Sequence, residues 1–240
     1  MPAAAPNPLN AYSPEWFQFF HEGIPEVRTA QEAGFISALC PVADFPRILD
    51  VCCGMGRHSR ALASLGYAVT GIERDPAAVA AAVRQSGGPV YREMDIRDWR
   101  PEPESFDAAV ILSQSFGFFG AEANLEILTR LAAALRPGGR IVLDLWNPAF
   151  FLTRQGRRDF VLPGGMVVET KQMTGDRLTV RLDYPGGGSD LFEWQTFTEI
   201  QMADFAGKAG LGVMPALTDY DPAATPSPDR PKIQFVLERG

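Results

Sequence analysis

The sequence has few of the residues that bind metals or form disulfides. Its 240 residues include three cysteines and two histidines. The cysteines, Cys40, Cys52 and Cys53, show no zinc-type spacing, and their number is odd. We expect them to be small buried side chains near the first strand. The sequence therefore predicts neither a metal site nor a disulfide framework.

Long apolar runs and an excess of basic residues are also missing. No run reaches the roughly 18 residues needed to cross a membrane. The N-terminus lacks the charged and apolar regions of a secretory signal. The net charge of −7 is opposite to the basic face that nucleic-acid binding uses. We therefore predict a cytoplasmic protein that binds neither membranes nor nucleic acids.

What the sequence does contain is a pattern of strand, glycine turn and helix. The apolar residues 48–51 predict a buried strand, and a helix is expected over about 57–65. Between them, Gly54 and Gly56 supply backbone freedom for a sharp turn that a ligand can approach closely. The helix would point its free N–H groups at that ligand.

The charges around this turn distinguish between two kinds of ligand. Dinucleotide enzymes place G-x-G-x-x-G here, but the third glycine position is Ser59. Asp50, at the end of the strand, would repel a pyrophosphate and would attract an ammonium group. S-adenosylmethionine carries an ammonium, a sulfonium and a carboxylate, so it fits this pattern better. Cys53 is expected to line the same pocket because of its position.

The second predicted strand, residues 67–72, ends on Glu73, 19 residues after Gly54. A carboxylate at the tip of this strand can accept hydrogen bonds from both ribose hydroxyls. Asp75 followed by Pro76 then begins a helix. We therefore assign Glu73, with its neighbour Arg74, to the cofactor site.

Four segments, in this order, resemble the successive motifs of class I S-adenosylmethionine-dependent methyltransferases: residues 49–56, 71–73, 94–99 and 135–144. More loosely, residues 111–119 and 146–148 resemble a bacterial small-molecule subgroup that includes aminosugar N-methyltransferases. The resemblance implies that Asp95 meets the adenine amino group and that the backbone of Ile96 holds the ring edge. Ser113, after the fourth strand, is then expected beside the transferable methyl group.

The expected fold is α/β: a Rossmann-like, doubly wound sheet of seven strands, mostly parallel with an antiparallel last strand. Residues 47–146 and 198–240 form this cofactor-binding domain. Thr198 and Gln201 have the spacing of a capping box, and the last three strands are expected over 141–145, 211–220 and 233–238. Gly-rich turns and four short strand patterns over 147–197 predict an antiparallel insert, which either covers the active site or forms a homodimer interface. Hairpins are expected at residues 163–165 and 174–176. Residues 1–46 are predicted as an N-terminal helical lid, although its aromatic helix could equally well pack on the body of the fold.

No acid–base constellation stands out, and His21 and His58 are read as structural. Residues 147–148 are not the signature of amino-methylating DNA enzymes, which belongs after the fourth strand. The candidates for the acceptor site come from topology alone, and they are Tyr12, Trp16, Ser113, Phe116, Trp146, Asn147, Arg181 and Tyr220.

The predicted function is methyl transfer from S-adenosylmethionine to a small molecule by in-line displacement, with S-adenosylhomocysteine as product. The alternatives are a binding protein that keeps the cofactor pocket without catalysis and, less favoured, an NAD-linked oxidoreductase. The acceptor atom, nitrogen, oxygen or carbon, stays open.

Overall fold

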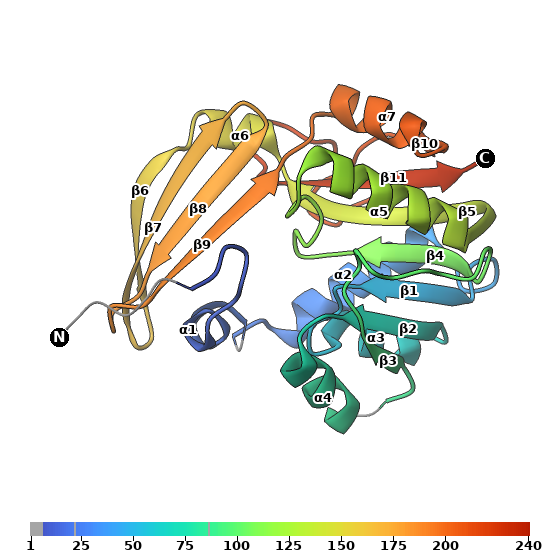
Figure 1. Ribbon diagram of the computed structural model, residues 1–240, viewed down its shortest axis with the longest axis horizontal. Coiled ribbons are helices and arrows are strands. Elements are labelled where there is room, and N and C mark those ends of the chain that lie inside the picture. Colours follow the sequence, from blue (N-terminus) through green and yellow to red (C-terminus); the bar gives the residue numbers. More distant parts are fainter. Residues whose placement is uncertain (1–6, 22, 86) are drawn as a thin grey trace.

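A computed structural model describes residues 7–21, 23–85 and 87–240. Its larger sheet has seven strands in the order β10-β11-β5-β4-β1-β2-β3 (Figure 1). All neighbours in this sheet are parallel except β11, which is antiparallel to both β5 and β10. The predicted fold class is therefore confirmed. The strands are β1 (Arg47–Val51), β2 (Ala68–Glu73), β3 (Val90–Glu93), β4 (Phe106–Ile111), β5 (Leu135–Trp146), β10 (Leu211–Val213) and β11 (Lys232–Arg239).

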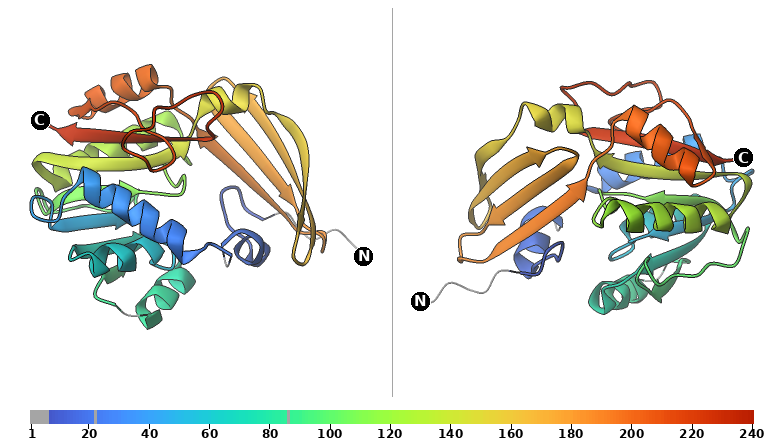
Figure 2. Two further views of the ribbon diagram at one scale, coloured as in Figure 1. Left: turned by 180° about the vertical axis from the view of Figure 1, so that it is seen from behind. Right: turned by 45° about the horizontal axis from the view of Figure 1, so that its top comes forward.

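Helices cover both faces of this sheet (Figures 1 and 2). On one face, α5 (Ala121–Ala134) and α7 (Glu199–Lys208) pack on alternate strand residues such as Leu49. On the other face, α2 (Glu26–Leu39) and α3 (Arg57–Ser64) pack on the intervening residues such as Ile48. Because successive side chains of a strand point to opposite faces, one apolar strand supplies two cores.

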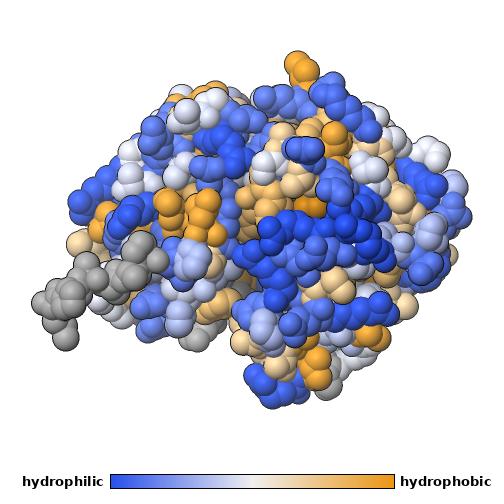
Figure 3. All heavy atoms as spheres, in the orientation of Figure 1, coloured by the Kyte–Doolittle hydropathy of each residue, from blue (hydrophilic) through white to orange (hydrophobic). Residues whose placement is uncertain are grey.

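Local signals explain several boundaries. Thr198 and Gln201 form the predicted capping box at the start of α7. The backbone N–H of Ala77 donates to the Asp75 carboxylate beside α4 (Pro76–Gln85). The surface seen in Figure 3 is mostly hydrophilic with scattered hydrophobic residues, as expected when the apolar side chains fill the cores.

The second sheet is antiparallel in the order β6-β7-β8-β9. Two-residue loops join its first three strands, because Leu162 pairs with Gly165 and Thr174 pairs with Arg177. The predicted antiparallel insert and both predicted hairpins are confirmed. The strands are β6 (Gly156–Leu162), β7 (Gly165–Thr174), β8 (Arg177–Asp183) and β9 (Ser189–Gln195).

The N-terminal segment lies between the two sheets and is fastened to the second one (Figure 1). It contains α1 (Pro14–Trp16) and the π-helical η1 (Phe17–His21). Asp190 of β9, only 1% exposed, accepts hydrogen bonds from the Ser13 hydroxyl and from the Tyr184 hydroxyl, both at 2.8 Å. The Asn7 side chain and the Ser13 backbone donate to the same carboxylate. The helix α2, in contrast, packs on the first sheet.

Three boundaries differ from expectation. The strand β5 begins at Leu135, where a register shift pairs it with Phe106 before the main ladder starts. The strand β10 ends at Val213 rather than near residue 220, because Pro215 has no N–H to donate to the ladder. A short helix, α6 (Pro148–Leu152), was not expected, although Asn147 caps it and Pro148 begins it.

Candidate active site

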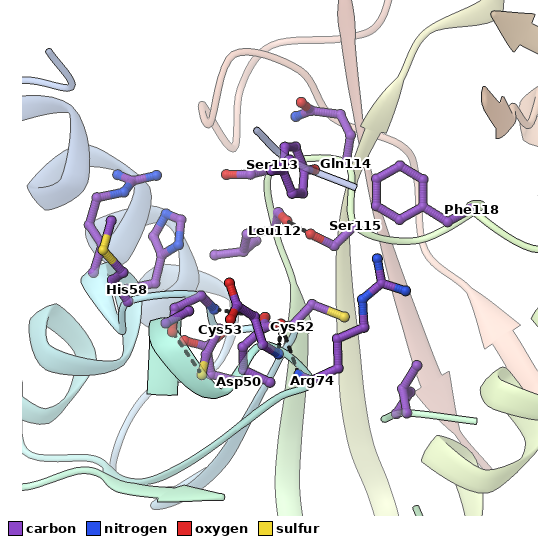
Figure 4. A pocket seen from close by; sticks show the side chains of 18 of the residues that line it. Asp50, Cys52, Cys53, His58, Arg74, Leu112, Ser113, Gln114, Ser115 and Phe118 are labelled. Atoms are coloured by element: carbon purple, nitrogen blue, oxygen red, sulfur yellow. Dashed lines mark hydrogen bonds between the residues drawn. The ribbon is translucent and has the colours of Figure 1, made fainter. Parts of the chain in front are cut away.

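A cavity of about 960 Å³ lies at the carboxyl edge of the parallel strands, bounded by the N-terminal segment and by β9. Ligands bind at this edge in open α/β sheets. In Figure 4, side chains from the turn after β1 and from the segment after β4 face the same space. Of the nine predicted cofactor residues, Asp50, Cys53, Gly54, Glu73, Arg74, Asp95, Ile96 and Ser113 line it.

Left-handed backbone shapes the turn between β1 and α3. Cys52, Gly54 and Gly56 all have positive φ, at 57°, 54° and 75°. A Cβ on Gly54 would point into open space, so a ligand can approach the main chain there. A Cβ on Gly56 would collide with the ring of Tyr91. Gly56 does not line the cavity; it forms the N-cap of α3.

Three predicted carboxylates line the cavity and differ in their burial and hydrogen bonding. Asp50 is 2% exposed and accepts a 2.5 Å hydrogen bond from Ser59, and its burial raises the pKa. Glu73 accepts from the backbone N–H groups of Gly54 at 3.1 Å and Arg74 at 2.8 Å. The Arg97 guanidinium lowers the pKa of Asp95 by hydrogen bonding to it.

A buried cluster around Glu32 was not predicted. Glu32 accepts from Arg57 at 2.5 Å, from His58 at 2.7 Å and from Arg28 at 2.9 Å. Burial would raise the pKa of Glu32, but His58 and Arg57 lower it to about 2. The three basic side chains line the cavity beside the start of α3. Since Glu32 precedes His58 by 26 residues, no local motif joins them.

The opposite half of the cavity is aromatic. The ring of Tyr12 lies 4.3 Å from Trp16 and 5.1 Å from Phe192. Trp194 stacks on Phe192 at 5.6 Å. Tyr12, Trp16 and Trp146 were predicted here and do line the cavity. Phe192 and Trp194 also line it and were missed. Strand alternation in β9 puts Phe192 and Trp194 on the inner face, but the sequence could not show what that face covers.

Four predicted acceptor residues lie away from the cavity lining. Phe116 packs in the core, 5.8 Å from Phe197. Asn147 caps α6 and donates to the carbonyls of the 221–231 link. Arg181 is exposed beside Asp183, since its neighbours in β8 occupy the buried face. Tyr220 is buried edge-on against Phe35, at 5.5 Å.

The remaining candidate residues are two cysteines and one histidine. Burial raises the pKa of both Cys52 and Cys53, so these thiols stay protonated and are poor nucleophiles. The side chain of His21 is outside the described part of the chain.

Among residues 7–21, 23–85 and 87–240, no group of acids, histidines and cysteines could hold a metal ion. In the same residues, no helix is long and apolar enough to span a bilayer.

Comparison with known proteins agrees with this geometry. Residues 48–139 match the model of a family described as a methyltransferase domain. This segment holds the glycine turn and the ends of β1 and β2, and it is similar to a methyltransferase domain. The match agrees with the predicted class, an S-adenosylmethionine-dependent methyltransferase, and favours methyl transfer over the oxidoreductase alternative.

Two curated relatives differ in how much of their length is matched. A dTDP-3-amino-3,6-dideoxy-alpha-D-glucopyranose N,N-dimethyltransferase of Streptomyces fradiae is 34% identical over 41% of this chain and 39% of its own length. The chain thus spans about two fifths of that relative. Human glycine N-methyltransferase is 26% identical over 82% of both chains.

Among solved structures, an amino pentose methyltransferase of Micromonospora echinaspora with S-adenosylmethionine bound superposes with a TM-score of 0.70. It is 24% identical to this chain, and the superposition covers 96% of this chain and 99% of the other. At this identity the similarity shows a shared fold.

Proposed function

We propose that this methyltransferase transfers a methyl group from S-adenosylmethionine to an amine nitrogen of a small molecule. The observation that carries the proposal is one cavity of about 960 Å³ with a charged half and an aromatic half. Pockets for small ligands are typically about 300–1,000 Å³, so this volume leaves room for a cofactor together with a small acceptor.

The charged half suits the parts of S-adenosylmethionine. Glu73 at the tip of β2 would accept from the ribose hydroxyls, and Asp95 and Ile96 would hold the adenine. All three residues line the cavity. The open space over Gly54 leaves the main chain accessible. Asp50 would meet the ammonium. Arg28 and Arg57 supply positive charge for the carboxylate, because a single Glu32 cannot neutralise two guanidinium groups.

The aromatic half suits an amine. The faces of aromatic rings attract cations, and tryptophan does so most strongly. Trp16, Trp146 and Trp194 line this half. An amine and its methylated ammonium product would both be stabilised there. Names of relatives support the same chemistry, since the Streptomyces fradiae and human proteins are both N-methyltransferases.

When bound, S-adenosylmethionine supplies a methyl group activated by its sulfonium. The chain's own contribution is to hold the acceptor nitrogen in line and to exclude water, which together supply roughly 7–11 kcal/mol in well-oriented reactions. The lining carboxylates come from β1, β2, β3 and the loops that follow them. The aromatic half is lined mainly by uncharged side chains, so an ammonium acceptor would lose its proton to solvent before it reacts.

Cyclohexylamine and cyclohexanol provide a matched test, with S-adenosylhomocysteine formation as the readout. We expect methylation of the amine alone, at a rate that rises with pH as the free amine accumulates. Calorimetric titration with S-adenosylmethionine should show binding in the same sample. Binding without turnover of any amine would favour the non-catalytic alternative, and methylation of cyclohexanol alone would refute amine specificity.

The remaining predictions are independent of this proposal. A homodimer, a cytoplasmic location and the absence of nucleic-acid substrates stay predictions, as do the domain boundaries and the lid role of residues 1–46. Gel filtration with light scattering would test the dimer directly.

A further inference from the structure

Ser59 stands where dinucleotide enzymes have the third glycine of their phosphate turn, which lets the helix pack closely on the strand. In this chain the serine side chain lies between α3 and β1 and is 0% exposed. Its hydroxyl donates a 2.5 Å hydrogen bond to Oδ2 of Asp50. A side chain therefore joins the helix and the strand that frame the glycine turn.

The hydroxyl of Ser59 has a competing acceptor near its own helix. A serine in a helix often donates to the carbonyl four residues earlier, which here belongs to Met55. That carbonyl accepts from the Arg60 guanidinium at 2.7 Å. The Ser59 hydroxyl donates instead to the carboxylate of β1, so the serine serves Asp50 rather than its own helix.

The Asp50 carboxylate uses one oxygen in this bond and keeps the other available. Oδ1 has no hydrogen-bond partner among the described residues and is not one of their fully buried unpaired atoms. Because Asp50 lines the cavity, this oxygen is open to a ligand there. An ionised carboxylate only accepts hydrogen bonds, so the partner for Oδ1 must be a donor such as an ammonium group.

Charges on three elements face Asp50. Burial raises the pKa of Asp50, whereas Arg57 and, when protonated, His58 of α3 lower it. Glu73 at the tip of β2 raises the pKa of Asp50 further. The two side chains of α3 are themselves engaged by Glu32 of α2, at 2.5 Å and 2.7 Å. The ionised form of Asp50 therefore has shared rather than dedicated support from its charged neighbours.

The hydrogen bond from Ser59 is the dedicated support. It lowers the pKa of Asp50 against the effect of burial. The neighbouring thiols of Cys52 and Cys53 stay neutral, because burial raises the pKa of both. Removing the serine hydroxyl would leave Asp50 without a hydrogen-bond donor among the described residues.

We infer that Ser59 is a positioning residue for the cofactor, whose hydroxyl holds Oδ2 of Asp50 so that Oδ1 meets the cofactor's ammonium. The site thereby prefers nucleosides that carry an amino acid. This inference rests on the proposed cofactor site. 5′-Methylthioadenosine has the adenosine and the thioether but neither the ammonium nor the carboxylate, so its binding should not depend on Ser59.

Titration calorimetry with 5′-methylthioadenosine and S-adenosylhomocysteine tests this inference without turnover. S-adenosylhomocysteine keeps the ammonium and has no methyl group to transfer. We expect Ser59→Ala to weaken its binding about tenfold at neutral pH, the value of one hydrogen bond to a charged group. Binding of 5′-methylthioadenosine should stay unchanged. Ser64→Ala is the matched control, because that exposed hydroxyl at the end of α3 donates only to the Ala61 carbonyl, at 2.7 Å.

The pH profile of S-adenosylhomocysteine binding gives a second readout. Only ionised Asp50 attracts the ammonium, so affinity falls as pH drops through the pKa of Asp50. Loss of the Ser59 hydrogen bond raises that pKa, so the fall should begin at a higher pH in Ser59→Ala than in wild type. Any effect of His58 is common to both proteins, and the displacement between their profiles is the measurement.

Two further variants separate positioning from packing. Ser59→Cys keeps the shape with a weaker donor, and its profile should lie between those of wild type and Ser59→Ala. In an Asp50→Asn background, Ser59→Ala should cause no further loss of affinity, because the two residues act as one unit.

Equal losses for both ligands, or coincident pH profiles, would overturn the inference and leave the cofactor site intact. If Ser59→Ala does not fold, the profile of Ser59→Cys decides in the same way. If wild type binds neither ligand, the proposed cofactor site fails, and the role of Ser59 fails with it.

Discussion

The two halves of the cavity are built in different ways. The cofactor half is formed mainly by β1, β2, β3 and the turns that follow them, which succeed one another in the sequence. The aromatic half is assembled from the N-terminal segment, the ends of β4 and β5, and β9. Phe192 therefore meets Tyr12, 180 residues earlier in the chain, at 5.1 Å.

The difference teaches which constraints leave a mark on a sequence. The cofactor half needs glycine where φ is positive and a carboxylate at a strand tip, so particular residue types stand at particular spacings. The aromatic half needs volume and π faces, which Phe, Tyr or Trp from any nearby element can supply. The first requirement leaves a motif of fixed spacing in the sequence. The second leaves only a high content of aromatic residues, without a fixed spacing.

The largest expected effect concerns how the aromatic half is held together. Asp190→Ala would leave the donors of Ser13 and Tyr184 without their acceptor, at a cost of about 4 kcal/mol in the free energy of unfolding. Denaturant unfolding measures this loss, and hydrogen exchange should rise over residues 7–21. Asp183→Asn is the matched control, because that half-buried carboxylate of the same sheet pairs with the exposed Arg181. A free energy of unfolding within about 1 kcal/mol of that of wild type would contradict the role of Asp190.

The next effect concerns the cofactor half. Glu73→Ala should weaken S-adenosylmethionine binding about 100-fold, or about 3 kcal/mol, because both ribose hydroxyls lose a charged acceptor. Titration calorimetry gives the affinity, and an unchanged melting curve would show that the fold is intact. Glu102→Ala, an exposed residue of the loop before β4, should bind as wild type does. Unchanged affinity in Glu73→Ala would refute the ribose assignment.

The Glu32 cluster predicts a dependence on acid. The pKa of Glu32 is lowered in the folded state to about 2 from 4.5, so its contribution is present above pH 4.5 and is lost as pH falls toward 2. We expect a loss of about 2 kcal/mol, allowing for the exposure of Arg28. Unfolding of wild type and Glu32→Gln across this range measures it. If the difference in free energy of unfolding between wild type and Glu32→Gln does not shrink as pH falls, the stabilising role of the Glu32 cluster is contradicted.

The smallest expected effect tests whether Arg181 lies outside the acceptor site. Arg181→Ala should change stability by less than about 0.5 kcal/mol, since the side chain is exposed and its ion pair is weak. Its KM for cyclohexylamine should match that of wild type. Tyr12→Ala, inside the cavity, should raise the same KM. A raised KM in Arg181→Ala would return that residue to the site.

Sequence reasoning succeeded where local physics decides the outcome. The capping box at Thr198, the two hairpins and the tips of β1 and β2 follow from neighbouring residues. It failed where distant segments meet. Glu32 finds His58, and Asp144 finds Gln114, only through tertiary packing. Arg181 was placed in the site because the insert was expected there, but alternation along β8 turns it outward.

The position of β11 within the first sheet affects how the protein is made. This strand lies between β5 and β10, yet it follows the entire second sheet in the sequence. During synthesis the ribosome therefore releases the cofactor motifs first, and for the next 85 residues after β5 (from 147 to 231) the edge of that strand has no partner. Nascent chains would carry an open β5 edge, the kind of edge that pairs with other chains. The need for chaperones during folding should thus depend on the number of residues between β5 and β11 in the sequence rather than on the size of the cavity.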